Sequence, residues 1–117
     1  MNTEILFSYL NSFNGVEESS PFGIRSNVYK VGGKMFCTFG HLYEPPHLTL
    51  KVSPDQIPSL IDQYEFIIPG YYMNKKHWIT IEFREDIRVD LEFVKAMINE
   101  SYMLVFSKLS KKIRNEI

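Results

Sequence analysis

The chain has 117 residues with a single cysteine and a formal net charge of −1, and hydrophobic residues make up 44% of it. This is the composition of one globular domain, and it excludes a disulfide-stapled fold, a disordered chain and a strongly basic protein. No apolar run is long enough to span a membrane and the N-terminal residues lack the basic start of a signal peptide, so we expect a cytoplasmic protein without membrane association.

An amphipathic helix is the first element expected, over residues 3–13, because apolar side chains recur there at helical spacing. Asn2 or Thr3 supplies its N-cap, and Asn14-Gly15 supplies a left-handed stop. Residues 17–21 follow with the composition of a loop.

Strand character then begins with a β-hairpin over 28–39, where Gly32-Gly33 suits a two-residue turn. The alternation over 47–52 predicts a second strand region, and Ser53-Pro54 predicts the start of a short helix that ends near residue 64. Pro69-Gly70 is expected to make a turn before a strand over 77–83.

Two helices are expected at the C-terminal end of the chain. Asp90 caps the first, an interruption falls at 99–101, and Ser101 caps the second. A weaker pattern at 87–89 predicts a short strand. Short connections between strands favour antiparallel pairing, so we predict an α+β fold: a two-layer single domain with an antiparallel sheet and helices mainly on one face.

The alternation also assigns the two faces of this sheet. Leucine and isoleucine are expected to face the helices, at Leu48, Leu50, Ile79 and Ile81. The open face then receives polar and aromatic side chains, namely His47, Thr49, Lys51, Trp78 and Thr80, with Lys30, Lys34 and Thr38 beside them.

Three segments resemble the MmcQ/YjbR-like family: the hairpin residues 28–36, the Pro-Gly to His-Trp segment 69–78, and the Ser-Tyr to Lys-Leu segment 101–109. The resemblance extends over residues 27–114 in the family's order, so the whole chain, 1–117, is expected to be one MmcQ/YjbR-like domain. It implies a compact α/β domain with an antiparallel sheet and helices against one side. It also suggests DNA as a ligand, by analogy of shape, and it supplies no catalytic residues.

Catalytic and metal-binding patterns are not found among the polar residues. Gly32-Gly33-Lys34 lacks the earlier glycine and the following Ser or Thr of a phosphate-binding P-loop, so we interpret it as a turn. His41, His47 and His77 lie on different elements without metal-ligand spacing. Cys37, expected on the same face as Met35 and Phe39, is interpreted as a core residue.

The serines Ser53 and Ser101 are explained as helix caps. We therefore predict no catalytic residue, no metal site and no cofactor, and an enzyme ranks third, after two kinds of binding protein, because no constellation of nucleophile, base and oxyanion donor can be assembled from the spacing.

Local charge is more informative than the total, because basic residues gather in segments 25–51, 69–81 and 108–114. Lysines next to aromatic rings suit contact with phosphate and stacking on bases. The nucleic-acid or anion-binding residues predicted on this ground are Lys30, Lys34, Lys51, Lys75, Lys76, His77, Trp78, Tyr71 and Tyr72.

Two functional hypotheses follow. The first is a non-enzymatic binding protein whose leading ligand is DNA, held by this basic and aromatic surface. The second is a domain that binds a small molecule, such as an anionic metabolite, or a protein through the aromatic region 66–78. An apolar pocket with salt-independent affinity would favour the second.

Overall fold

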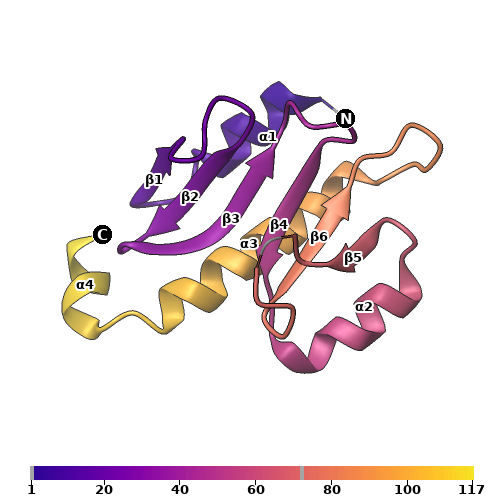
Figure 1. Cartoon of the computed structure of the whole chain (residues 1–117). Coiled ribbons are helices and arrows are strands. Elements are labelled where there is room, and N and C mark those ends of the chain that lie inside the picture. The colour runs from indigo at the N-terminus through magenta and orange to yellow at the C-terminus, as the bar shows by residue number, and fades with distance from the viewer. Residues whose placement is uncertain (1, 72) are drawn as a thin grey trace.

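Six strands form one antiparallel sheet in the order β1-β2-β3-β4-β6-β5 in the computed structural model, which describes residues 2–71 and 73–117 (Figure 1). The strands are β1 (Val16–Ser19), β2 (Asn27–Val31), β3 (Lys34–Gly40), β4 (His47–Lys51), β5 (Ile67–Pro69) and β6 (Trp78–Glu82). The helices are α1 (Thr3–Leu10), the 3-10 turn η1 (Pro54–Gln56), α2 (Ile57–Gln63), α3 (Leu91–Ser107) and α4 (Lys111–Glu116). The α+β class and the antiparallel sheet are confirmed.

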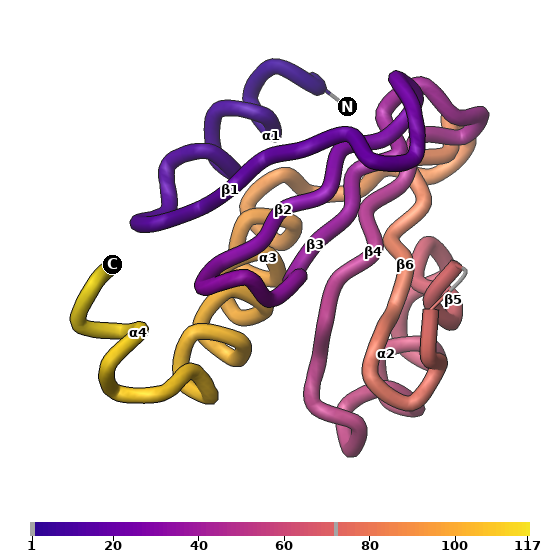
Figure 2. The backbone as a smooth tube through the Cα atoms, turned by 60° about the vertical axis from the view of Figure 1, so that its left-hand side comes forward, coloured from indigo at the N-terminus to yellow at the C-terminus, as the bar shows by residue number. Residues whose placement is uncertain are grey.

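Helices α1 and α3 cover one face of the sheet and lie behind it in Figure 1. Figure 2 shows them on the same side of the strands, with α2 beside β5 at the far edge. The helix-facing rows run Cys37–Leu50–Ile79 and Phe39–Leu48–Ile81, and every one of these side chains is fully buried. The predicted division between a helix-facing row and an open face is therefore confirmed on β4 and β6. None of the described helices is long and apolar enough to cross a membrane.

A β-bulge changes the facing predicted for the first hairpin. Tyr29 pairs with Cys37 and Lys30 pairs with Met35, so Phe36 is an extra residue of β3 that has no partner on β2. Cys37 and Phe39 face the helices as expected, but Met35 lies on the opposite face. The prediction that these three share one face was wrong, because the extra residue reverses the alternation at that point.

Ser101 is part of the middle of α3 rather than a cap between two helices. Its hydroxyl donates to the Phe36 carbonyl (2.6 Å) and accepts from the Lys51 backbone N–H (3.0 Å). It thus pairs two backbone groups beside the bulge, and this tertiary role explains a polar residue that is only 1% exposed. The interruption predicted at 99–101 was wrong.

Other boundaries differ for local reasons. Helix α1 ends at Leu10 rather than 13, since the Asn11 side chain donates to the Phe7 carbonyl and to Glu18. The segment predicted as a loop at 17–21 is mostly strand β1, and β5 was not predicted. Residues 87–89 form no strand. Asn2 and Asp90 cap their helices as predicted, while Ser53 precedes η1 without a side-chain capping hydrogen bond.

A ligand cavity on the open face of the sheet

The floor of the open face is a row of threonines across three strands. Thr38 on β3 pairs with Thr49 on β4, which pairs with Thr80 on β6. The Thr49 and Thr80 hydroxyl oxygens lie 2.9 Å apart, and both residues are buried. The Thr80 oxygen also accepts from the backbone N–H of Tyr71 at 3.0 Å, which fixes the start of the loop between β5 and β6 to the sheet.

Three loops rise around this floor and border an open cavity of about 430 Å³, which we call the sheet-face cavity. Its lining residues are Phe22, Ser26, Met35, Thr38, Gly40, Tyr43, His47, Thr49, Tyr71 and Met73. They come from the sheet and from the loops that precede β2, β4 and β6. None of these described lining residues is Asp, Glu, Lys or Arg, so the cavity is apolar and aromatic with a few hydroxyl groups and one imidazole.

His47 supplies the titratable group of this cavity. Its ring lies between Tyr43 and Tyr71, with centroids 5.3 Å and 4.7 Å away, and its Nδ1 is 3.3 Å from the Pro45 carbonyl oxygen. Burial lowers the pKa of His47, against the opposing effects of that carbonyl and of Glu82. Burial thus favours the neutral form of the ring. Donation from Nδ1 to Pro45 leaves Nε2 as a hydrogen-bond acceptor.

Two further features fix the positions of the Tyr71 and His47 rings. The Tyr71 hydroxyl donates to a carboxylate oxygen of Glu82 on β6. Gly40 leaves room for the His47 ring, because a Cβ at that position would lie 2.8 Å from Nε2. Thr38, Thr49 and His47 were placed on the open face by the strand alternation, but Phe22, Met35 and Tyr43 were not predicted as site residues.

The predicted stacking residue Trp78 is on the open face but is only 8% exposed. Gly70 lies against it so closely that a Cβ there would be 2.7 Å from the Trp78 Cβ. The ammonium of Lys51 also lies over the indole ring, 6.0 Å from its centroid. The covered ring offers no free face for a base. Of the other predicted aromatic residues, Tyr71 lines the sheet-face cavity and Tyr72 lies outside the described residues.

The other predicted binding residues lie outside the sheet-face cavity. Lys75 donates to the Gly70 carbonyl at 3.0 Å, while Lys30 and Lys76 are exposed. The half-buried His77 closes the sheet through its backbone, whose carbonyl accepts from Val52 at 2.9 Å. Lys34 and Lys51 line a different hollow. None of these six residues is among those that line the sheet-face cavity.

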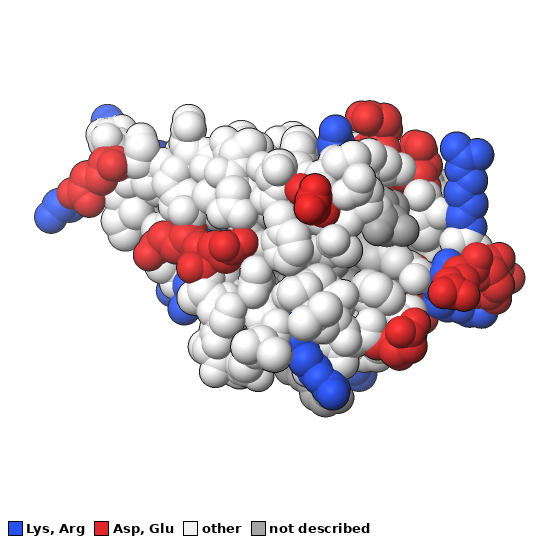
Figure 3. All heavy atoms as spheres, turned by 90° about the horizontal axis from the view of Figure 1, so that it is seen from above, with Lys and Arg blue, Asp and Glu red and all other residues white. Residues whose placement is uncertain are grey.

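The charges visible on one side of the molecule are scattered. Figure 3 shows acidic and basic side chains next to one another at both ends of the molecule, with wide uncharged areas between the two ends and no continuous basic stretch. This side therefore offers no basic track for a nucleic-acid backbone.

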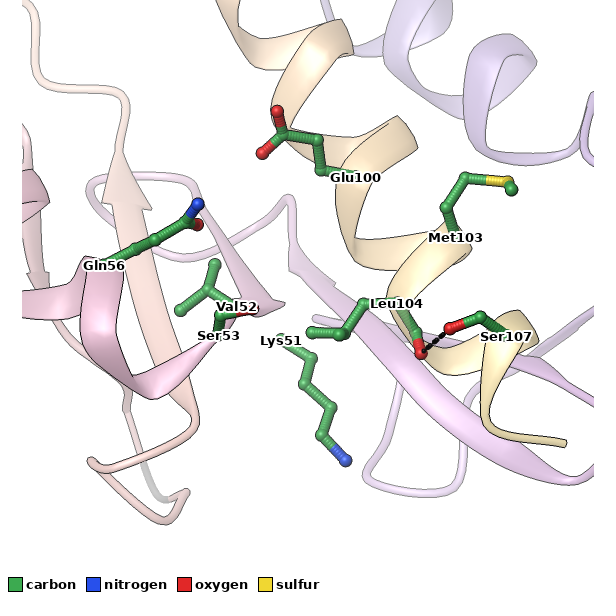
Figure 4. Close-up of a pocket in the computed structure, with 8 residues that line it drawn as sticks. All are labelled: Lys51, Val52, Ser53, Gln56, Glu100, Met103, Leu104 and Ser107. Carbon is green, nitrogen blue, oxygen red and sulfur yellow. Dashed lines mark hydrogen bonds between the residues drawn. The ribbon is translucent and has the colours of Figure 1, made fainter.

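A second groove, of about 400 Å³, lies between η1 and the C-terminal half of α3. Figure 4 shows Lys51 and Glu100 pointing away from each other across it, and Ser107 donating to the Leu104 carbonyl at 3.0 Å. Because its polar groups diverge, this groove gathers no set of groups that could act on one ligand.

Comparison with known proteins shows the family to which the chain belongs. The family model described as YjbR matches residues 11–104. The chain belongs to the YjbR family.

Curated relatives of this YjbR-family protein include YbdF of Escherichia coli O157:H7, named an uncharacterized protein. The two sequences are 39% identical over 104 residues, which is 87% of this chain and 82% of YbdF. YjbR of Escherichia coli K12, also named uncharacterized, is 27% identical over 81 residues, or 69% of each chain.

Solved structures show the same fold. The crystal structure of Deinococcus radiodurans DR2400 superposes with a TM-score of 0.87 at 30% identity, covering 98% of this chain and 86% of that one. A Pseudomonas syringae protein of 22% identity superposes with a TM-score of 0.74 over 90% of this chain and 99% of its own. The MmcQ/YjbR-like resemblance of the three sequence segments is thereby confirmed.

Metal-binding side chains do not cluster in the described part of this YjbR-family chain. Among residues 2–71 and 73–117, no three His, Cys, Asp or Glu side chains are placed to hold a metal ion. Cys37 is fully buried, which raises the pKa of its thiol and keeps it in the neutral form, so its role as a core residue is confirmed.

Proposed function

We propose that this protein binds a small, uncharged and mainly apolar or aromatic molecule in the sheet-face cavity. The observation that carries the proposal is the lining of that cavity, which combines tyrosine, phenylalanine and methionine side chains with His47 and two threonines, and includes no charged residue among those described. An ionic ligand would lose its hydration there without gaining a counter-ion. An uncharged aromatic ligand would lose little.

The size and the chemistry of the cavity agree with this class of ligand. Its volume of about 430 Å³ falls within the roughly 300–1,000 Å³ that is usual for small-molecule sites. Aromatic rings at Tyr43 and Tyr71 provide stacking surfaces, and Met35 and Met73 adapt to irregular shapes. The neutral His47 provides one hydrogen-bond acceptor, which favours a ligand with an N–H or O–H group.

A fluorescent probe tests the proposal directly. N-phenyl-1-naphthylamine is uncharged and aromatic and carries one N–H, so its emission should rise saturably with one site per chain. Affinity should not change between about 50 mM and about 300 mM NaCl, because no ion pair forms. A failure to saturate, or affinity that falls steeply with salt, would count against the cavity as an uncharged site.

Matched methionine variants locate the probe. Met35→Ala removes a lining side chain and should weaken binding about tenfold, which corresponds to ~1.4 kcal/mol. Met103→Ala makes the same change on α3, where the side chain is 49% exposed and does not line the cavity, and should leave the affinity unchanged. Equal effects of the two variants would place the probe elsewhere.

DNA binding is the second candidate. It is supported by two exposed lysines, Lys75 and Lys76, in a segment that contains no acid over residues 69–81. An anisotropy titration with single- and double-stranded DNA should then show binding that weakens with salt and is lost in a Lys75→Glu/Lys76→Glu variant. Binding that is indifferent to both changes, or absent at low salt, would remove this candidate.

A further inference from the structure

Three lysines from three separate elements line one hollow of about 300 Å³ at the corner where α3 meets α4. We call it the three-lysine hollow. Lys34 comes from the start of β3, Lys51 from the end of β4, and Lys108 follows the last residue of α3. The other lining residues are Gly32, Val105, Leu109, Ser110 and Ile113, so no acidic residue is among the described residues that form it.

The fold itself brings these lysines together. Gly32 and Gly33 have positive φ angles of 56° and 78°, as a tight hairpin turn requires. Gly32 also packs on the α3–α4 corner, since a Cβ there would lie 2.7 Å from a Leu109 methyl and 3.0 Å from an Ile113 methyl. This close packing fixes the hairpin tip, and with it Lys34, next to Lys108.

Counter-ions for the three lysines are not found in the described part of the chain. The ion pairs there are Arg84–Asp86 and Lys95–Glu92, and they include none of the three. Glu100 lines the neighbouring groove together with Lys51, but Figure 4 shows the Lys51 side chain pointing away from it. The cation–π contact with Trp78 orients the Lys51 ammonium without neutralising its charge.

We infer that the three-lysine hollow binds the phosphate group of a ligand. Three lysines that line one concave surface, with no carboxylate among the described lining residues, attract a multiply charged anion, and each ammonium group offers donors to phosphate oxygens. Ser110 adds a hydroxyl group to the same wall. This site is separate from the sheet-face cavity, which shares none of its lining residues, and it would stand even if that cavity bound nothing.

The phosphate group has two possible sources, a free phosphorylated molecule or a nucleic-acid backbone, and a titration with two probes separates them. Amide NMR spectra are recorded while inorganic pyrophosphate or an oligothymidylate of about 12 nucleotides is added at low salt. Binding in the hollow should shift the amides of Gly33, Lys34 and Ser110 saturably with either probe. Equal affinity for the two points to a free phosphorylated ligand, whereas much tighter oligothymidylate binding points to a nucleic acid.

Matched variants decide whether these lysines are responsible. Lys34→Gln/Lys108→Gln should weaken both probes about tenfold and reduce the dependence on salt. Lys30→Gln/Lys112→Gln removes the same charge from exposed positions outside the hollow and should weaken them less than twofold. All four side chains are exposed, so unchanged thermal melting confirms that both variants fold.

Two results would overturn the inference. One is the absence of saturable shifts at the hairpin tip and at Ser110. The other is an equal loss of affinity in the two double variants, which would show only that total charge matters.

Discussion

The two faces of the sheet are formed by the same strands, but one is packed against helices and the other carries a cavity. Toward the helices, Leu50 and Ile79 are fully buried in the hydrophobic core. Toward the loops, their neighbours Thr49 and Thr80 pair through their hydroxyls, and Thr49 lines the floor of a cavity. One face therefore holds the core and the other holds the cavity that we propose as a site, and single substitutions should separate the two roles.

The largest difference is expected between Leu50→Ala and Thr38→Val. Leu50 is fully buried against the helices, and its truncation should cost about 2–5 kcal/mol of unfolding free energy. Thr38 is half-buried on the open face, and Thr38→Val should change stability by less than about 1 kcal/mol. Urea unfolding measures both, and similar losses would break the distinction between the two faces.

Ser101→Ala tests the polar link between α3 and the sheet. It removes the hydroxyl shared by the Phe36 carbonyl and the Lys51 N–H, and should cost about 1–3 kcal/mol because two backbone groups lose their partner. Ser107→Ala, on the exposed end of the same helix, should change stability by less than about 0.5 kcal/mol. Equal unfolding midpoints for the two variants would contradict the bridging role.

Thr80→Val sharpens the comparison on the open face. Its hydroxyl accepts from the Tyr71 amide and pairs with Thr49, so its loss should cost about 1–2 kcal/mol and weaken binding of the naphthylamine probe by freeing the loop that carries Tyr71. Thr49→Val leaves the Tyr71 contact intact and should cost less. A larger loss for Thr49→Val than for Thr80→Val would show that the loop is held by other contacts.

The smallest effect concerns the edge strand β1 and pH. Hydrogen bonds from Tyr29 and Asn11 hold the pKa of Glu18 below its usual value. Because the folded-state pKa is the lower one, this stabilisation is complete above the unfolded-state value of about 4.3 and is lost as pH falls through the folded-state pKa. Glu18→Gln should therefore flatten the acid side of the stability profile, measured by thermal melts from about pH 3 to 7. Glu17→Gln is the matched control and should not flatten it.

The helix-facing side of the sheet could be predicted from sequence because apolar residues recur at every second position along β4 and β6. Among the residues that line the cavity, Thr38, His47 and Thr49 were placed on the open face for the same reason, and Tyr71 was predicted as a site residue. The cavity walls could not be predicted, since Phe22 and Tyr43 come from loops that carry no periodic signal. The burial of Trp78 could not be predicted either, because it depends on tertiary contacts such as that of the Lys51 ammonium over its ring.

Missed elements have equally local causes. Strand β1 carries polar, exposed side chains and is recognised only through its pairing with β2. Strand β5 has three residues, too few for a period to show. The bulge at Phe36 is stabilised by Ser101, which lies 65 residues away in sequence. Contacts of this kind cannot be read from a local pattern.

The most direct test of the functional account is to map the naphthylamine probe on the chain by amide NMR at pH 7.5. The account predicts saturable shifts at Thr38, Thr49 and Tyr71 that are the same at about 50 mM and about 300 mM NaCl, with the amides of Leu109 and Ser110 unmoved. Shifts confined to the α3–α4 corner, or no saturable shift on the open face, would contradict the assignment of the sheet-face cavity as the binding site.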